Sequence, residues 1–255
     1  MVPPDVNSNN IINLWTNGSA KEFTPGITLV GSGNLSINCS PDIQILYVVD
    51  SNGIHLFACA HVEINPKDLY IYDEDQNVGL YATQYTISIS VLGADPGHLV
   101  RTTPENQVDS TEITVGDSVD FGIDAGFAGP KPEVKGSIGY SADNEHTYSL
   151  PDVIITNNSK DLTASWSFDI PQVNITSGVF DRPKNIQKSN FAADVDAYWR
   201  YDQLHDNMAM FQIRITATMN RTYIDHGIWA SLENDTNIFS GSADINIKIP
   251  PRGTE

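Results

Sequence analysis

Titratable and metal-binding side chains are the first place to look for chemistry in this chain. The six histidines are scattered, and no His-x-x-x-His or Cys-x-x-Cys spacing is present, so we expect no transition-metal site. Asp73-Glu-Asp-Gln-Asn77 begins like a calcium loop, but it lacks the glycine at the sixth position and the glutamate at the twelfth. It is predicted to be a solvated acidic turn, and no cofactor is expected.

The sequence also lacks the common motifs that identify catalytic residues. The chain has no Gly-x-Ser-x-Gly elbow and no phosphate-binding loop. Carboxylates are abundant, but none of them is marked as a catalytic pair. We therefore predict that the protein is not an enzyme. A β-sandwich glycosidase is the enzyme alternative, because its two acids can lie far apart in the sequence.

The clearest pattern lies in residues 113–127, where apolar and polar side chains alternate. Apart from Asp117, the odd positions are apolar: Ile113, Val115, Val119, Phe121, Ile123, Ala125 and Phe127. The even positions are small, hydroxylated or acidic: Thr114, Gly116, Ser118, Asp120, Gly122, Asp124 and Gly126. Because side chains alternate across a strand, this segment is predicted to have one apolar face and one polar face.

A second alternating arm follows a cluster of strand breakers. The cluster is Gly129-Pro130-Lys131-Pro132, which no central strand can contain. After it, one face carries Val134, Gly136, Ile138, Tyr140 and Ala142, and the other carries Lys135, Ser137, Gly139, Ser141 and Asp143. The two arms and the breaker cluster predict a long β-hairpin.

Two alternating arms around a turn are typical of a membrane β-hairpin, with one face toward lipid and the other toward a lumen. Crossing the hydrocarbon takes about 9–11 residues per tilted strand, and each arm supplies that length. The alternative is an ordinary amphipathic hairpin on a soluble sandwich, because soluble antiparallel sheets alternate too. An isolated hairpin leaves backbone groups unpaired in lipid, so the membrane interpretation requires several copies that close a barrel.

The two faces give the hairpin residues separate roles. The membrane-inserting side chains are predicted to be Val115, Val119, Phe121, Ile123, Phe127, Ile138 and Tyr140. The pore-lining charges are predicted to be Asp120, Asp124, Lys135 and Asp143. Rings of carboxylate attract cations, so we expect a mildly cation-selective, water-filled channel.

The rest of the chain is predicted to be antiparallel β-structure. Residues 43–50 and 54–59 read as a hairpin joined by Ser51-Asn52-Gly53, and Asn-Gly suits its tight turn. Alternation with a period of two recurs in residues 83–91, 166–170, 211–219 and 245–249. One-face alternation of this kind is typical of sandwich strands, so the fold class is predicted to be all-β.

The charge balance limits the partners. Lys and Arg number 14 against 32 Asp and Glu, for a formal net charge of −18. A surface this acidic repels nucleic acid, and it gains nothing from general attraction to anionic lipid. Contact with a membrane must then come from local apolar or headgroup-binding groups. Solubility alone is the simpler explanation of the acidity.

Several features bear on the compartment. No run of 18 apolar residues predicts a transmembrane helix, and the first residues lack the pattern of a signal peptide. Asn-x-Ser/Thr sites favour an extracellular protein; they begin at Asn17, Asn34, Asn38, Asn157, Asn174, Asn220 and Asn234. Cys39 and Cys59 lie in neighbouring strand-like segments, where a disulfide and two buried thiols are both open alternatives.

Several short motifs occur in an order that resembles one protein family. They are Tyr85-Thr-Ile-Ser-Ile-Ser-Val91, Pro104-Glu-Asn-Gln-Val-Asp-Ser-Thr111, Ser137-Ile-Gly-Tyr-Ser141, Tyr148-Ser-Leu-Pro-Asp152, Ala164-Ser-Trp-Ser-Phe168 and Gly178-Val-Phe-Asp-Arg182. In this order they resemble the cap strand, the lead into the stem, the stem, its end, a Trp-x-Phe strand and a rim stretch of the leukocidin/haemolysin family of β-barrel pore-forming toxins.

The resemblance implies a secreted monomer that binds a target membrane through lipid or a receptor, assembles into a homo-oligomeric ring and inserts one stem hairpin per protomer. A second toxin component is needed in some members of the family. The alternative is a secreted, non-lytic binding module of the lectin or adhesin kind. That alternative explains sandwich strands, but it does not explain the two-faced, Gly-rich hairpin.

The resemblance also implies a division of the chain. A cap sandwich is expected over residues 1–110, completed by residues 209–255, with a stem over residues 111–150 and a rim over residues 151–208. In the monomer the stem is expected to fold against the sandwich as a pre-stem. The membrane contact is predicted to involve Phe180, Arg182, Tyr198, Trp199 and Arg200. The simpler alternative makes Trp199 a core residue and Arg200 a surface charge.

Overall fold

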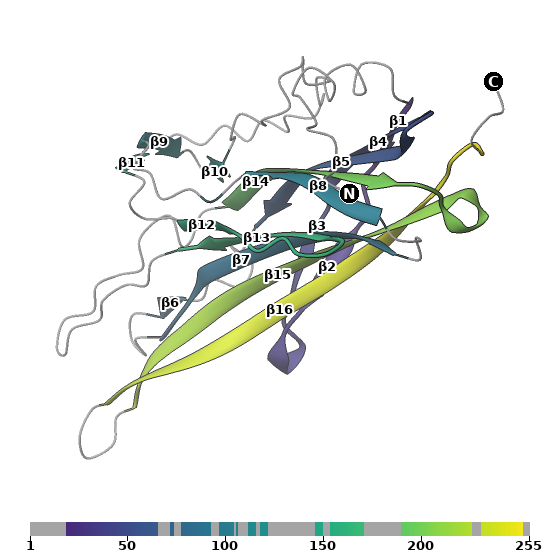
Figure 1. Ribbon diagram of the computed structural model, residues 1–255. Helices are drawn as coiled ribbons and strands as arrows, with labels where there is room; N and C mark the ends of the chain where they lie inside the picture. Colours follow the sequence, from purple (N-terminus) through teal and green to yellow (C-terminus); the bar gives the residue numbers. More distant parts are fainter. Residues whose placement is uncertain are drawn as a thin grey trace.

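Two facing β-sheets and a separate pair of short strands make up the described part of the computed structural model (Figure 1). The structure describes residues 19–65, 72–73, 78–92, 97–104, 106, 112–115, 118–121, 146–149, 154–170, 190–225 and 231–251. Within these residues there is no helix long and apolar enough to span a bilayer.

The first sheet, sheet A, has six strands. They are β1 (Ser19–Phe23), β4 (Asp42–Asp50), β5 (Gly53–Ile64), β14 (Asn190–Tyr201) and β10 (Ser118–Phe121) in spatial order, with β8 (Gly97–Thr103) also paired to β14. Alternate residues of each long strand point into the sandwich, as the buried even positions of β5 and odd positions of β14 show. Sheet A therefore has an inner face toward the core and an outer face on the opposite side.

The second sheet, sheet B, has eight strands. Their order is β12 (Ile154–Asn157), β13 (Thr163–Asp169), β7 (Val78–Leu92), β15 (Met208–Asp225), β16 (Ser231–Lys248), β2 (Ile27–Val30) and β3 (Ser36–Cys39), and β6 (Tyr72–Asp73) pairs with β7. A separate pair consists of β9 (Glu112–Val115) and β11 (His146–Ser149). Two short 3-10 turns, η1 (Ser32–Asn34) and η5 (His205–Asn207), complete the described elements.

A continuous apolar core fills the space between the sheets. Among its fully buried large side chains are Trp166 and Phe168 from β13, and Phe211 from β15. On the sheet A side, Phe191 at the start of β14 stacks on Tyr85 with ring centroids 4.2 Å apart. Burial of aromatic rings from both layers is the main force holding such a sandwich together.

The all-β fold predicted from the sequence is confirmed, and so is the first hairpin. β4 and β5 pair antiparallel through Asp50 and Gly53, with Ser51 and Asn52 at the turn. Gly53 has φ 146°, and a Cβ there would lie 2.6 Å from the carbonyl oxygen of Tyr201. Only glycine fits this conformation and this close approach, which explains the Asn-Gly sequence.

The range expected to form the rim, residues 151–208, contains three strands of the two sheets, and the domain division stays a prediction. β12, β13 and β14 all lie within residues 151–208, yet β12 and β13 belong to sheet B and β14 runs through sheet A. The physical reason is their alternation, since Ala164, Trp166 and Phe168 of β13 all point into the core. Residues 151–153 and 171–189 lie outside the described residues, so a rim within 171–189 stays a prediction.

Candidate functional site

The first arm of the predicted hairpin reaches sheet A through β10. Its four residues pair in parallel with the start of β14, with Val119 opposite Phe191 and Phe121 opposite Ala193. All the other pairings between described strands are antiparallel. Parallel pairs are slightly less stable per residue, and this ladder joins only four residues of β10 to the sheet.

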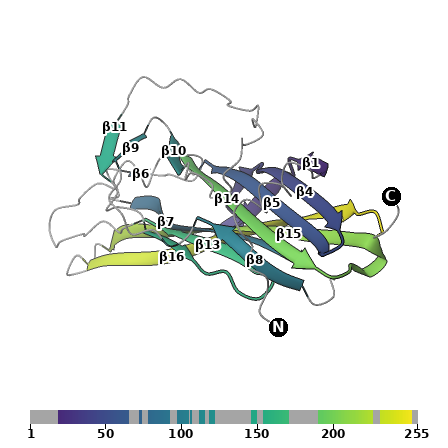
Figure 2. The ribbon, with the colours of Figure 1, turned by 45° about the horizontal axis from the view of Figure 1, so that its top comes forward.

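One edge of β14 pairs with two strands, β8 and β10, and β10 lies at one end of that edge. Asp196 to Tyr201 pair with β8, whereas Asn190 to Ala193 pair with β10. The other edge of β14 is covered by β5 from Phe191 to Tyr201. Figure 2 shows β10 beside the end of β14, with β9 and β11 beyond it. Removing β10 would therefore uncover four residues of one edge and leave the remaining ladder of sheet A in place.

The four residues of β14 that pair with β10, Asn190 to Ala193, are called here the seat of β10. The inner side of the seat packs into the core. Phe191 is buried, stacks on Tyr85, and meets Phe168 edge-on with centroids 5.1 Å apart. Ala192 and Ala193 are also buried. Phe191 and Ala193 are thus part of the sandwich core, and the described backbone of β10 is joined to this sheet by one four-residue ladder.

The base of the predicted hairpin is formed by β9 and β11. These strands pair antiparallel, with Val115 opposite His146 and Glu112 opposite Ser149. The midpoint of each pair falls between Pro130 and Lys131. The register of the two arms therefore centres on the breaker cluster that the sequence singled out as the turn.

A charged cluster lies beside the seat on the outer face of sheet A. The imidazole of His61 on β5 lies 2.8 Å from a carboxylate oxygen of Asp194 and 3.3 Å from one of Glu63. The hydrogen bond to Asp194 raises the pKa of His61 to about 9, against the opposing effect of burial. Asp194 directly follows Ala193 in β14, so this ion cluster ties β14 to β5 next to the residues that hold β10.

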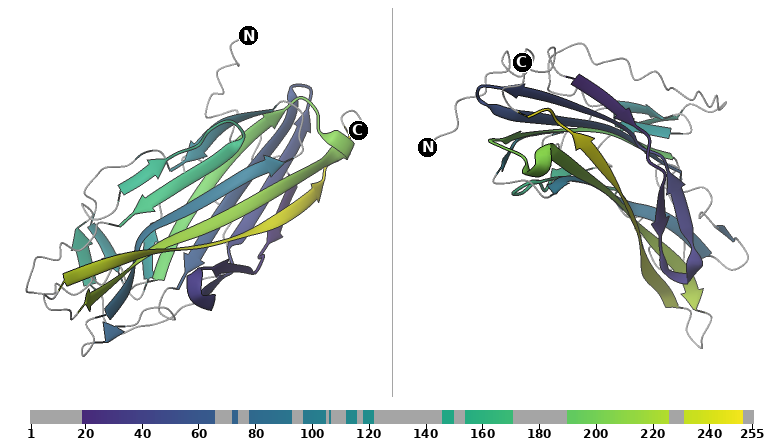
Figure 3. Two further views of the ribbon diagram at one scale, coloured as in Figure 1. Left: turned by 90° about the horizontal axis from the view of Figure 1, so that it is seen from below. Right: turned by 90° about the vertical axis from the view of Figure 1, so that its right-hand side faces the viewer.

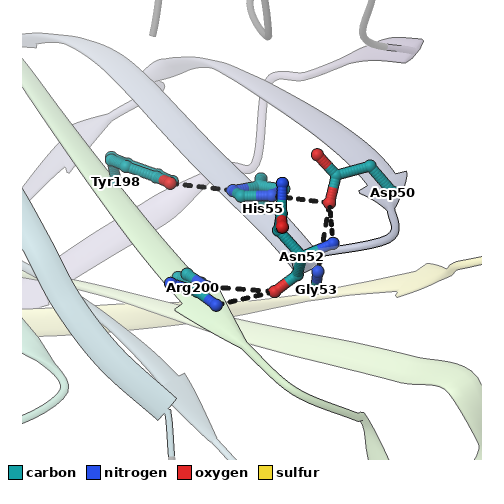
Figure 4. A network of polar contacts seen from close by, with 6 residues as sticks. All are labelled: Asp50, Asn52, Gly53, His55, Tyr198 and Arg200. Carbon is teal, nitrogen blue, oxygen red and sulfur yellow. Dashed lines mark hydrogen bonds and ion pairs between the residues drawn. The ribbon is translucent and has the colours of Figure 1, made fainter. Parts of the chain in front are cut away.

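A second polar network lies near the other end of β14 (Figure 4). His55 joins the hydroxyl of Tyr198 at 2.8 Å to a carboxylate oxygen of Asp50 at 3.2 Å. The same oxygen accepts the backbone N–H of Asn52 at 2.7 Å. Partial burial would raise the pKa of Asp50, but these hydrogen bonds outweigh it and lower the pKa.

Arg200 holds the β4–β5 turn against β14. Its Nε and Nη2 donate to the carbonyl oxygen of Asn52 at 3.2 and 2.8 Å. Arg200 stands ten residues along β14 from Asn190, which corresponds to roughly 30 Å in an extended strand. In the structure Arg200 therefore stabilises the β4–β5 turn, far from the residues that pair with β10. Its role in binding a lipid headgroup stays a prediction.

Tyr198 and Trp199, which were predicted to contact the membrane, are both buried in the described sandwich. Trp199 is fully buried, donates its indole N–H to the carbonyl oxygen of Leu162 at 2.9 Å, and meets Phe211 edge-on. Tyr198 is buried against Phe57 with ring centroids 4.4 Å apart, and burial raises its pKa to about 12. Both rings are thus enclosed in the folded sandwich, which favours the core alternative for Trp199, and their role at a membrane stays a prediction.

The remaining predicted site residues divide into two groups. The backbone places Val115 on β9 and Val119, Asp120 and Phe121 on β10. Others lie outside the described residues, and their roles stay predictions: Ile123, Asp124, Phe127, Lys135, Ile138, Tyr140, Asp143, Phe180 and Arg182. β14, which carries the seat, was not singled out from the sequence, although the alternation of Phe191, Ala193, Val195, Ala197, Trp199 and Tyr201 marks it.

The cysteines remain thiols. Cys39, on β3 of sheet B, points into the core, and burial raises its pKa to about 11. Cys59 lies on β5 of sheet A, and the neighbouring Ala58 and Ala60 take the core-facing positions. No group of His, Cys, Asp and Glu is placed to hold a metal ion in the part of the chain that the structure describes.

Comparison with known proteins finds no matching family model and no matching curated protein. Among solved structures, the Clostridium perfringens delta-toxin is similar with 12% identity and a TM-score of 0.49, over 89% of this chain and 96% of the toxin. The Clostridium perfringens NetB toxin in its membrane-inserted form gives 10% identity and a TM-score of 0.47, over 90% and 97%. A pore-forming protein gives 10% identity and a TM-score of 0.47, over 89% and 95%. With TM-scores below 0.5, the case for a function rests on this chain's own residues.

Proposed function

We propose that this protein is a secreted pore-forming toxin. In this proposal the monomer binds a target membrane, several copies assemble into a ring, and each copy inserts residues 113–150 as one hairpin of a shared β-barrel. Phe180, Arg182 and Arg200 remain our candidates for contact with lipid or a receptor. The proposal includes no enzymatic step and no cofactor.

The register of β9 and β11 carries the proposal. If this ladder continued toward the turn, Phe121 would pair with Tyr140, Ile123 with Ile138, and Phe127 with Val134. Each of these pairs joins an apolar residue of one arm to an apolar residue of the other. A register that was unrelated to a hairpin would have no reason to match the two apolar faces, or to centre on the breaker cluster.

The polar faces match in the same register. Continuation of the ladder would place Asp120 opposite Ser141, Asp124 opposite Ser137, and Lys135 opposite Gly126. All of these side chains would then line the lumen, because residues directly opposite one another share a face. Between residues 118 and 143 the hairpin would have one continuous lipid face and one continuous aqueous face, as a membrane barrel requires.

The placement of β10 supplies a route to the inserted state. Residues 118–121 would leave β14 and pair instead with residues 140–143, while β9 and β11 keep their pairing. The hydrogen bonds lost at the seat belong to one short parallel ladder, and the barrel would replace them with antiparallel ones. Four residues of β14 would be uncovered, and the sandwich core would remain intact.

A reversible lock on β10 tests this function. Asp120 and Ala192 are opposite each other in the β10–β14 register, and adjacent strands lie about 4.8 Å apart, which a disulfide can bridge. We expect Asp120→Cys with Ala192→Cys, in a Cys59→Ser background, to bind vesicles but release no trapped dye when oxidised. Reduction should restore release to the wild-type level.

A matched control places a disulfide elsewhere in the same sheet. Gln44 is opposite Cys59 in the β4–β5 register, so Gln44→Cys allows a bond to the native Cys59 without touching β10. The oxidised control should release dye as the wild type does. Undiminished release by the oxidised β10 lock, with thiol titration showing that its disulfide has formed, would refute the proposed route.

A further inference from the structure

The outer face of sheet B carries an unusual concentration of hydroxyl groups. The strand registers place side chains in rows across the sheet, and the residues that alternate with the buried positions form this surface, which we call the hydroxyl face. One row holds Ser165, Ser88, Arg214 and Ser242, and the next holds Ser167, Thr86, Thr216, Ser240, Val30 and Ser36. Figure 3 (left) shows β13, β7, β15 and β16 side by side, facing the viewer.

Charge is nearly absent from this face. The flanking rows hold Thr163, Ser90, Gln212 and Asp244 on one side and Asp169, Gln84, Thr218 and Ile238 on the other. Each of the two carboxylates accepts a bond from a glutamine amide, Asp169 from Gln84 at 2.6 Å and Asp244 from Gln212 at 3.0 Å. Arg214, at the centre, is exposed and forms no ion pair with any residue that the structure describes.

The hydroxyl groups already satisfy one another along β7 and β13. Ser88 and Ser165 are hydrogen-bonded at 2.8 Å, and Ser90 and Thr163 at 3.0 Å. Burying this part of the face would therefore leave few polar atoms without a partner, which is the usual cost of covering a polar surface. Short side chains also lose little conformational entropy when they become ordered.

Exposed apolar side chains lie at one side of the hydroxyl face. Val30 and Ile238 are 57% and 60% exposed and sit on neighbouring strands, since Val30 is opposite Ser240. Leu35, 40% exposed, belongs to the adjoining turn, where Ser32 hydrogen-bonds Asn237. Three of the most exposed large apolar side chains among the described residues thus gather at one side of the hydroxyl face.

We propose that the hydroxyl face binds a second copy of this chain and forms one side of the contact between neighbouring protomers. Copies that each carry a net charge of −18 repel one another, so they can approach most closely where the surface is neutral. Arg214 adds attraction, because it would face an acidic surface of the neighbour. The two sides differ, so the contact is heterologous, and such contacts form a ring when the rotation between neighbours closes.

The face is large enough to contribute much of such a contact. Four rows about 6.6 Å apart, across the four strands β13, β7, β15 and β16 about 4.8 Å apart, cover roughly 500 Å². A standard interface buries about 800 Å² per partner. This inference rests on the proposed function, because the ring is the assembly in which the contact would form.

A single added carboxylate tests the interface. Ile238→Asp places a negative charge on the hydroxyl face at an exposed position, and Ala20→Asp places the same charge on an exposed position of β1 in sheet A. We would measure flotation, SDS-resistant oligomers and dye release with vesicles of phosphatidylcholine and cholesterol. Ile238→Asp should bind as the wild type does but assemble and release dye at least about tenfold less. Ala20→Asp should match the wild type throughout.

Arg214 gives a second measurement on the same face. Arg214→Glu should reduce oligomers at a given amount of bound protein, whereas Arg214→Lys should retain them. If Ile238→Asp and Arg214→Glu both assemble as the wild type does, the interface lies elsewhere and the pore-forming proposal stands. If the wild type itself forms no oligomer and releases no dye from these vesicles, both proposals are overturned.

Discussion

His61 and Asp194 face each other across β5 and β14, with the imidazole Nδ1 2.8 Å from the carboxylate Oδ1. The pair lies beside the four residues of β14 on which β10 rests. Glu63 lies on the other side of the imidazole, and Asp42 is opposite His61 on β4. The surroundings of His61 are therefore acidic on every neighbouring strand, which favours its charged form.

The first prediction concerns stability at alkaline pH. The pKa of His61 is raised from 6.5 to about 9, so its contribution to stability is complete below pH 6.5 and disappears as the pH rises through about 9. We expect wild-type protein to lose on the order of 2 kcal/mol more than His61→Gln between pH 7 and 10, measured by urea unfolding. His205→Gln, at an exposed position, is the control. Parallel pH profiles for wild type and His61→Gln would contradict the prediction.

The second prediction concerns the β4–β5 turn. Gly53→Ala would force a Cβ to within 2.6 Å of the Tyr201 carbonyl at a positive φ, so it should destabilise the protein by at least about 1 kcal/mol. Gly26→Ala is a matched control, because nothing lies within 4 Å of the position its Cβ would occupy. The control should be neutral or slightly stabilising. Equal unfolding midpoints for the two variants would show that the turn tolerates a side chain.

The third prediction separates a core role from a lipid role for Trp199. Replacing a fully buried tryptophan by alanine removes a large apolar volume, so Trp199→Ala should lose about 3–5 kcal/mol of stability. Binding to vesicles per folded molecule should be unchanged. A variant with wild-type stability and weakened binding would restore Trp199 as a membrane contact.

Much of the fold is predictable from the sequence, because its signals are local. The Asn52-Gly53 turn and the alternation in β7, β13, β15 and β16 depend on neighbouring residues alone. β14 alternates just as clearly, but an aromatic cluster of Tyr198, Trp199 and Tyr201 looks the same in a core strand and in a membrane patch. Only the layers on both sides decide between the two.

The pairing of β10 could not be predicted in the same way. Its partner lies about 70 residues further along the chain and runs parallel to it, and no pattern within residues 118–121 encodes either fact. By contrast, the match between the two arms of the hairpin is visible in the sequence once the register of β9 and β11 is known. The pairing of the two arms in the proposed inserted hairpin is therefore easier to predict from the sequence than the pairing of β10 with β14 in the monomer.

The fourth prediction concerns the charge preference of the pore. In the proposed register Asp120, Asp124 and Asp143 line the lumen, and Lys135 lies diagonal to Asp124, so it offsets part of the negative charge without reversing it. Asp120→Asn with Asp124→Asn should shift the reversal potential of channels in a planar bilayer toward anions. The cation preference of the wild type should weaken in high salt, because screening shortens to about 3 Å at 1 M. An unaltered reversal potential would mean that these carboxylates do not line the pore.

Cysteine accessibility along the first arm tests the central claim most directly. Single cysteines at positions 120, 121, 123 and 124, in a Cys59→Ser background, would be exposed to a charged methanethiosulfonate in open channels. Because side chains alternate along a strand, Asp120→Cys and Asp124→Cys should react and change the conductance in steps, whereas Phe121→Cys and Ile123→Cys should not. Reaction at all four positions, at none, or with the opposite alternation would contradict the claim that residues 113–150 form the wall of the pore.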